Sequence, residues 1–176
     1  TGAFDALESP EERFHDIDPS SPLEGTSRAE IISADATLNV PFQIGEQRLR
    51  YTGAWRAQWN QTPLTPQDRF AIGGRYTVRG FDGELSLSAE HGWTLQNTFA
   101  LALGGGHELY LGLDYGHVGG PSTRWQPGDR LAGGVIGLRG GWGRGYWDLF
   151  VGAPISKPDD FLTAYTTLGF SLGWQY

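Results

Sequence analysis

The 176-residue chain contains no cysteine, so it has neither a disulfide framework nor a thiolate metal site. It also lacks any run of roughly 18 apolar residues, the length that a membrane-spanning helix requires. Positive charge is scarce: there are 13 lysines and arginines against 20 aspartates and glutamates, and the net charge of −7 argues against a nucleic-acid partner. A membrane protein built from strands stays possible, because a transmembrane strand needs only about 9–11 residues of alternating polarity.

Signs of catalysis are missing as well. The four histidines are scattered and lack metal-ligand spacing. Ser86 and Ser88 have no recognisable histidine and aspartate partners. The adjacent acids of Glu11-Glu12 and Asp159-Asp160 point apart or lie in solvated loops, so they do not form a catalytic pair. We therefore expect neither an enzyme nor a bound metal or cofactor.

The 27 glycines and 13% aromatic residues are typical of a turn-rich all-β protein. Residues 1–32 are acidic and proline-containing, which predicts a loop. Beyond them, polar and apolar residues alternate with a period of two, which predicts strands. We expect seven such segments: residues 34–42, 48–59, 93–103, 108–118, 131–139, 146–153 and 167–176.

The connections between these segments also alternate. Residues 43–47, 104–107 and 140–145 form short glycine-bearing turns, whereas residues 61–92, 117–130 and 154–163 form long polar loops. Short turns at one end and long loops at the other are typical of an antiparallel outer-membrane β-barrel, with its long loops outside the cell. A soluble sandwich would also alternate, because one face must be buried. Aromatic residues near the strand ends, as in membrane-interface girdles, favour the barrel.

The last segment ends in phase with its apolar face. It resembles the C-terminal assembly signal of bacterial outer-membrane barrels, which implies the barrel-assembly machinery as a partner during biogenesis. The residues of this signal are Phe170, Leu172, Trp174 and Tyr176.

A glycine- and aromatic-rich run, residues 70–81, contains Arg79, and the strand Gly112-Leu113-Asp114-Tyr115-Gly116 follows about thirty residues later. We predict that Arg79 and Asp114 form a buried pair that locks the long loop inside the barrel, because an arginine offers a carboxylate two charge-assisted hydrogen bonds. The alternative is that Arg79 is solvated and that Asp114 pairs with Arg48 or Arg50.

Glycines and rings are expected to support this pair. Gly80 permits a sharp turn, while Gly112 and Gly116 leave space beside Asp114 that the rings of Phe81 and Tyr76 are expected to fill. The motif-loop residues are Gly73, Gly74, Tyr76, Val78, Gly80 and Phe81.

The hexapeptide of residues 77–82 resembles the sixth extracellular loop of the two-partner secretion transporters, the haemolysin-activator and filamentous-haemagglutinin transporter family of the barrel-assembly superfamily. Residues 70–76 resemble this family more than the wider superfamily, and residues 112–116 resemble the second superfamily motif. The resemblance implies a sixteen-stranded transmembrane β-barrel in the outer membrane of a Gram-negative bacterium, with a plug helix and two POTRA domains, that secretes a large exoprotein unfolded.

By that plan, the chain is the C-terminal part of such a transporter: an extracellular loop over residues 1–32, then the last seven strands over residues 33–176, with the motif loop at 61–92. Its implied partners are the exoprotein, outer-membrane lipid and lipopolysaccharide, and no cofactor is implied. An insertase of the same superfamily and a small self-contained β binding protein remain alternatives.

Three arginines share the polar face of one predicted strand: Arg48, Arg50 and Arg56. This cationic stripe could guide an unfolded polypeptide along the lumen, or it could balance inward acids such as Asp35 and Asp148. The sequence leaves both interpretations open.

Overall fold

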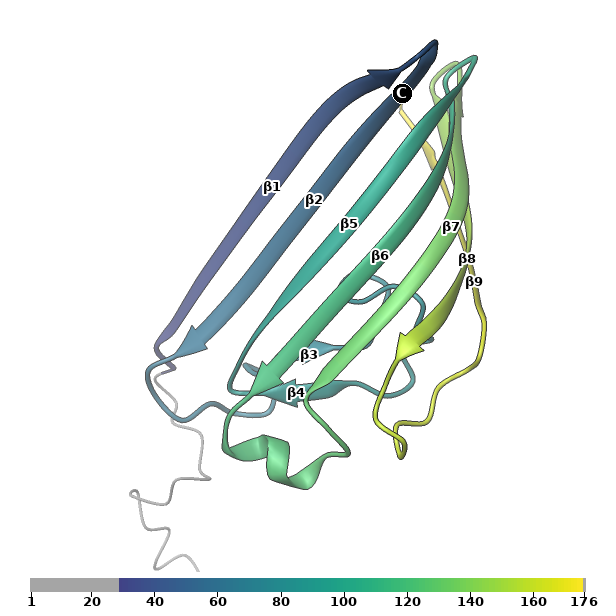
Figure 1. Cartoon of the computed structure of the whole chain (residues 1–176). Helices are drawn as coiled ribbons and strands as arrows, with labels where there is room; N and C mark the ends of the chain where they lie inside the picture. Colours follow the sequence, from purple (N-terminus) through teal and green to yellow (C-terminus); the bar gives the residue numbers. More distant parts are fainter. Residues whose placement is uncertain (1–28, 176) are drawn as a thin grey trace, which may run out of the picture.

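The computed structural model describes residues 29–175, and within that range the main element is one curved antiparallel sheet of seven strands (Figure 1). Its order is β1-β2-β5-β6-β7-β8-β9, so each strand pairs with the next long strand along the chain. The bounds are β1 Ile31–Ile44, β2 Gln47–Asn60, β5 His91–Gly104, β6 His107–Gly119, β7 Arg130–Trp142, β8 Gly145–Ser156 and β9 Thr167–Trp174.

The predicted all-β fold is confirmed, and all seven expected segments are strands. β1 begins at Ile31 rather than beyond residue 32, because Ile31 and Ile32 continue the pairing with Asn60 and Trp59. Most of the expected extracellular loop, residues 1–28, and Tyr176 lie outside the described residues.

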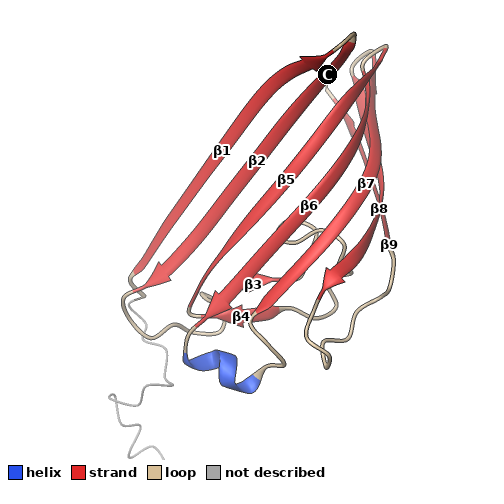
Figure 2. Cartoon of the chain, in the orientation of Figure 1, coloured by secondary structure: helices blue, strands red, loops and turns tan. Residues whose placement is uncertain are grey.

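Short turns join the strands at one end of the sheet, and the long connections gather at the other end (Figure 2). The structured part of these connections includes a 3-10 helix, η2, over Pro121–Trp125. Across residues 29–175, no helix is long and apolar enough to span a membrane.

Large apolar side chains cover the outer face of the sheet and are exposed on every strand. Examples, one per strand, are Leu38, Trp59, Phe99, Leu111, Ile136, Leu149 and Phe170. Soluble monomers rarely expose contiguous apolar patches larger than a few hundred Å². This face therefore fits an apolar surrounding rather than water, which argues against the soluble sandwich.

The motif loop, which ends at residue 90 because β5 begins at His91, folds back against the inner face of the sheet (Figure 1). It contains a two-stranded sheet that the sequence did not predict, β3 (Phe70–Ile72) paired with β4 (Leu87–Ala89). Strands of three residues are too short to show a period. The loop forms an apolar core with the sheet and with the connection between β8 and β9: Phe70, Ile72, Val78, Phe81, Leu87, Ala89, Val118, Leu131 and Phe161.

Candidate functional site

Arg79 and Asp114 lie together on the inner face of the sheet. The Nε and Nη2 atoms of Arg79 each donate a hydrogen bond of 2.7 Å, to Oδ2 and Oδ1 of Asp114 respectively. The backbone N–H of Arg79 adds a third bond to Oδ2, at 2.9 Å. The Asp114 side chain has no exposed surface. The carboxylate thus has three donors from one residue, two of them in the bidentate arrangement that makes arginine pairs strong.

Arg79 also reaches the neighbouring strand. Its Nη2 donates to Thr98 Oγ1 at 3.0 Å and to the carbonyl oxygen of Asn97 at 3.2 Å, both on β5. Thr98 lies directly opposite Gly112 in the β5–β6 register. The sequence analysis missed Thr98, although its place on the polar face of the strand was visible. Arg79 therefore bridges β5 and β6 rather than binding β6 alone.

The two glycines of the β6 motif make room for the loop. A Cβ atom at Gly112 would lie 2.7 Å from Arg79 Nη2, and one at Gly116 would lie 2.8 Å from Val78 Cγ2. Real Cβ contacts essentially never come so close. The guanidinium group of Arg79 therefore packs on Gly112, and the fully buried Val78 packs on Gly116.

The expectation that the Tyr76 ring fills this space is wrong: Tyr76 is 86% exposed. Aliphatic side chains, Val78 and Ile72, occupy the position beside Gly116 instead. Phe81 is buried as expected, with its ring edge-on to Phe161 at a centroid distance of 5.7 Å. The sequence did not reveal that Tyr76 sits in an exposed turn.

Three glycines of the motif loop have a positive φ, namely Gly73, Gly80 and Gly83, and at the first two an added Cβ would also crowd the backbone. Gly80 has φ +102°, and a Cβ there would lie 2.5 Å from the carbonyl oxygen of Ala153 on β8. Gly73 has φ +117°, and its Cβ would lie 3.0 Å from the carbonyl oxygen of Leu85. Gly74, by contrast, has open space around its missing side chain. Gly80 therefore lets the loop backbone pack directly on the sheet.

Asp82 ties the motif loop to the connection between β8 and β9. Its Oδ2 accepts a hydrogen bond of 2.6 Å from the Ala164 N–H, and its Oδ1 accepts one of 3.1 Å from the Glu84 N–H. The bond from Ala164 holds the pKa of Asp82 below its ordinary value. An Asp-Gly pair is a turn signal, but nothing in the sequence indicated the partner 82 residues away.

Glu90 ties the base of the motif loop to η2. Its carboxylate accepts hydrogen bonds from the hydroxyl and, at 3.2 Å, from the backbone N–H of Ser122, and Arg69 Nε lies 3.8 Å away. Burial alone would raise the pKa of Glu90, but these donors and Arg69 hold it below the ordinary value. The sequence analysis missed this contact, because no local pattern distinguishes Glu90 from an ordinary surface acid.

Comparison with known proteins adds to this geometry. Residues 1–140 match the family of haemolysin secretion/activation proteins ShlB/FhaC/HecB. The chain belongs to this family. It is 41% identical over 157 residues to the outer membrane transporter CdiB-2 of Burkholderia pseudomallei (strain 1026b). The predicted two-partner secretion family and the location in a Gram-negative outer membrane are thereby confirmed.

Two solved structures are similar to this chain. CdiB from Acinetobacter baumannii has a TM-score of 0.76 at 37% identity over 85% of this chain, and CdiB from Escherichia coli has 0.73 at 21% identity over 84%, which shows the shared fold alone. The chain spans 28% of each of these structures and 27% of CdiB-2, although the latter match takes in 86% of the chain itself. The chain therefore corresponds to just over a quarter of the length of these relatives.

The arginine stripe of β2 lies at the inner face, but it is not a row of unpaired cations. Arg50 Nη2 and Arg139 Nε both bind Glu108 Oε2, at 2.6 and 2.8 Å. The alternative pairing of Arg50 with Asp114 is therefore wrong. Arg56 lies opposite Asp35 in the β1–β2 register.

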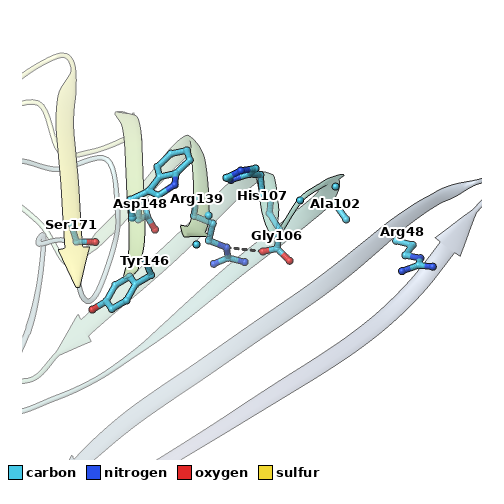
Figure 3. Close-up of a pocket in the computed structure, with 14 residues that line it drawn as sticks. Arg48, Ala102, Gly106, His107, Arg139, Tyr146, Asp148 and Ser171 are labelled. Carbon is cyan, nitrogen blue, oxygen red and sulfur yellow. Dashed lines mark hydrogen bonds and ion pairs between the residues drawn. The ribbon is translucent and has the colours of Figure 1, made fainter. Parts of the chain in front are cut away.

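Arg48, the third arginine of the stripe, lines a cavity of about 570 Å³ near the short turns (Figure 3). Asp148, one of the predicted inward acids, lines the same cavity, together with the Glu108–Arg139 pair. Figure 3 shows Arg48 standing apart from the other labelled side chains. Asp148 accepts a hydrogen bond of 2.8 Å from the Tyr110 hydroxyl. The cavity wall thus mixes both signs of charge, and a guiding role for the stripe stays a prediction.

The described part of the predicted C-terminal signal lies on the outer face of β9. Phe170, Leu172 and Trp174 are all exposed there, while Tyr176 is outside the described residues. Their small neighbours, Gly169 and Gly173, face inward beneath the rings of Phe150 and Tyr146 on β8. The strand therefore offers a continuous apolar row to its surroundings.

Proposed function

We propose that the full-length protein is an outer-membrane pore through which a large partner exoprotein passes in unfolded form, as in two-partner secretion. The Arg79–Asp114 anchor is the observation that supports this proposal best. It fixes a loop of about thirty residues against the inner wall, where a polypeptide in transit would pass. No cofactor takes part, and the exoprotein's folding outside the cell supplies the driving force.

The anchor helps to offset the conformational entropy that the motif loop loses when it becomes ordered. Ordering a loop costs roughly 1–2 kcal/mol per backbone residue, and the motif loop offsets this cost with its small apolar core and with the buried pair. Breaking a buried pair by removing one partner typically costs about 3–5 kcal/mol, because the other charge is left unpaired. Loss of the anchor is therefore expected to release the loop into the lumen while the sheet keeps its pairing.

We infer that the rest of the full-length protein supplies the remaining strands of the pore wall. The outer edges of β1 and β9 have no partner strand within the described residues. In lipid every backbone polar group must be satisfied, so a spanning sheet has to close. We infer that further strands, nine in a sixteen-stranded barrel, pair with these edges. The outer face would then contact lipid and lipopolysaccharide, and the barrel-assembly machinery would bind the row formed by Phe170, Leu172 and Trp174.

The test is export of the cognate exoprotein by full-length transporters carrying Arg79→Ala or Asp114→Asn. The matched control is Arg124→Ala, because Arg124 is an exposed arginine of η2 that takes no part in the pair. We expect both anchor variants to insert into the outer membrane at normal levels but to export little exoprotein, while the control exports normally. Undiminished export by both anchor variants would show that the pair does not serve secretion.

A further inference from the structure

A second arginine of the motif loop, Arg75, contacts strands β8 and β9, further along the sheet from the strands that Arg79 contacts. Its guanidinium carbon lies 5.0 Å from the centroid of the Phe150 ring on β8. Its Nη1 and Nη2 atoms lie 3.4 Å from the Phe170 carbonyl oxygen and from Ser171 Oγ, both on β9. Arg79 binds β5 and β6, so the two arginines hold the loop at opposite sides of the inner wall.

We propose that Arg75 is a second anchor of the motif loop, a positioning residue that fixes the loop tip, residues 73–77, to β8 and β9. Its part in secretion rests on the proposed function above, but the position of the tip can be measured independently of export. In space, between the strand contacts of Arg79 and those of Arg75, Gly80 packs on the backbone of β7 and β8 at Gly134 and Ala153. The loop thus crosses five neighbouring strands with a fixed contact on each.

The tip itself is a closed turn. The hydroxyl of Thr77 accepts hydrogen bonds of 3.2 Å from the N–H groups of Gly73 and Gly74 and donates one of 3.1 Å to the Gly74 carbonyl oxygen. Because the turn satisfies these backbone groups internally, they do not tie it to β8 or β9. The side chain of Arg75 makes that connection.

The chemistry of the contact requires arginine. A planar guanidinium group can stack on an aromatic ring and donate hydrogen bonds from its edge at the same time, whereas a lysine ammonium group is a strongly hydrated point charge that cannot do both. The two hydrogen bonds are long, so the stacking on Phe150 is expected to carry much of the contact. Arg75→Lys should therefore restore the position of the tip only in part.

Arg75 also determines what the turn presents to the lumen. Its neighbour Tyr76 is 86% exposed, and the guanidinium carbon of Arg75 lies 6.0 Å from the centroid of the Tyr76 ring. A tip that detaches from β8 and β9 would carry this ring to new positions across the lumen. The second anchor therefore sets the free cross-section along which an unfolded chain would move.

The experiment measures the distance from the tip to β9 with two spin labels. Cysteines replace Gly74, where nothing lies within 4 Å of an added Cβ, and the outward-facing Leu172 in the full-length transporter, after replacement of any cysteine outside the chain described here, which has none. The labelled protein carries in turn the native Arg75, Arg75→Ala, Arg75→Lys, Phe150→Leu and the control Arg124→Ala. Barrel insertion is checked for each variant by its heat-modifiable mobility on gels.

With native Arg75 and with Arg124→Ala, we expect one narrow distance distribution. Arg75→Ala should shift and broaden it, Phe150→Leu should act in the same direction, and Arg75→Lys should fall between. An unchanged distribution for Arg75→Ala in an inserted barrel would overturn the proposal. If the distribution broadens while export continues, the second anchor stands and its link to secretion is refuted. Loss of export in Arg79→Ala tests the proposed function separately.

Discussion

Gly80 brings the backbone of the motif loop against the carbonyl oxygens of two sheet strands. A side chain at this position meets two obstacles: a φ of +102°, which L-residues rarely adopt, and the carbonyl oxygen of Ala153 at 2.5 Å from the new Cβ. Neither obstacle is the end of a flexible side chain, so the backbone itself must move. A single methyl group at Gly80 is therefore expected to displace the backbone of the docked loop.

Gly80→Ala is accordingly expected to destabilise the docked loop by about 1–3 kcal/mol and to reduce export. Gly74→Ala is the matched control, since nothing lies within 4 Å of the Cβ that it adds. The measurement is protease sensitivity of the motif loop in outer-membrane vesicles, with export assayed in parallel. Equal protection of the two variants would mean that the loop does not pack on the sheet as described.

A double-mutant cycle isolates the pair itself. Arg79→Ala and Asp114→Asn each leave one buried partner behind, so each alone should cost about 3 kcal/mol, the lower end for a buried pair, because the Arg79 side chain keeps some solvent contact. The double variant should cost clearly less than the sum of the two. Unfolding of the purified transporter in detergent gives the free energies, and additive costs would show that the two residues act separately.

At the residue scale, the sequence predicted the Arg79–Asp114 pair but not the positions of all the side chains around it. Arg79 and Asp114 could be paired in advance because each stands out among glycines, and because the residues around them resemble a known motif. Tyr76 could not be placed, since the direction of a turn side chain depends on the hydrogen bonds of Thr77. Periodicity carries no information about that turn.

Among the elements, the connection that contains η2 is attached to the motif loop through Glu90. Ser122 donates hydrogen bonds to its carboxylate, the positive charge of Arg69 lies nearby, and both favour the charged form. The folded-state pKa of Glu90 therefore lies below its value in an unfolded chain. A depressed carboxylate pKa stabilises the folded state above the unfolded pKa, about 4.3, and this contribution is lost as the pH falls through the folded pKa.

Glu90→Gln should thus lower the thermal stability of the loops at neutral pH, and the difference from wild type should shrink as the pH falls below about 4. Hydrogen exchange in residues 118–129 at several pH values measures the effect. Glu84→Gln is the control, because Glu84 is an exposed acid of the same loop. A difference that stays constant with pH would mean that the charge of Glu90 does not hold η2 in place.

Length explains which elements the sequence revealed. The seven strands that form the wall have 8 to 14 residues each, long enough for a period of two to stand out. β3 and β4 have three residues each, and η2 has five, so their patterns cannot be told from chance. β3 and β4 are held by the loop core around Val78 and Phe161, and η2 is held by the bonds of Ser122 to Glu90, which are tertiary effects.

Across the whole molecule, the sheet separates two environments. Glu108 on the inner face gathers arginines from β2 and β7, 58 and 31 residues away in sequence, which no local pattern could have revealed. The outer face, by contrast, was predictable on most strands from their alternation of polar and apolar residues, and least on the glycine-rich β7. The separation of faces is also what a membrane-spanning barrel requires, with lipid outside and water inside.

β1 offers a direct test of this orientation, because Thr37 and Leu38 are adjacent at its middle and lie on opposite faces. Leu38 is 58% exposed on the outer face, and Thr37 shares the inner face with Asp35. An arginine on the lipid face at the bilayer midplane costs about 2–4 kcal/mol, whereas one facing the lumen is tolerated. Leu38→Arg should therefore reduce the amount of inserted, heat-modifiable barrel, and Thr37→Arg should leave it close to wild type. If the two arginines had equal effects, the apolar face would not be in contact with lipid, and a protein interface would have to cover it instead.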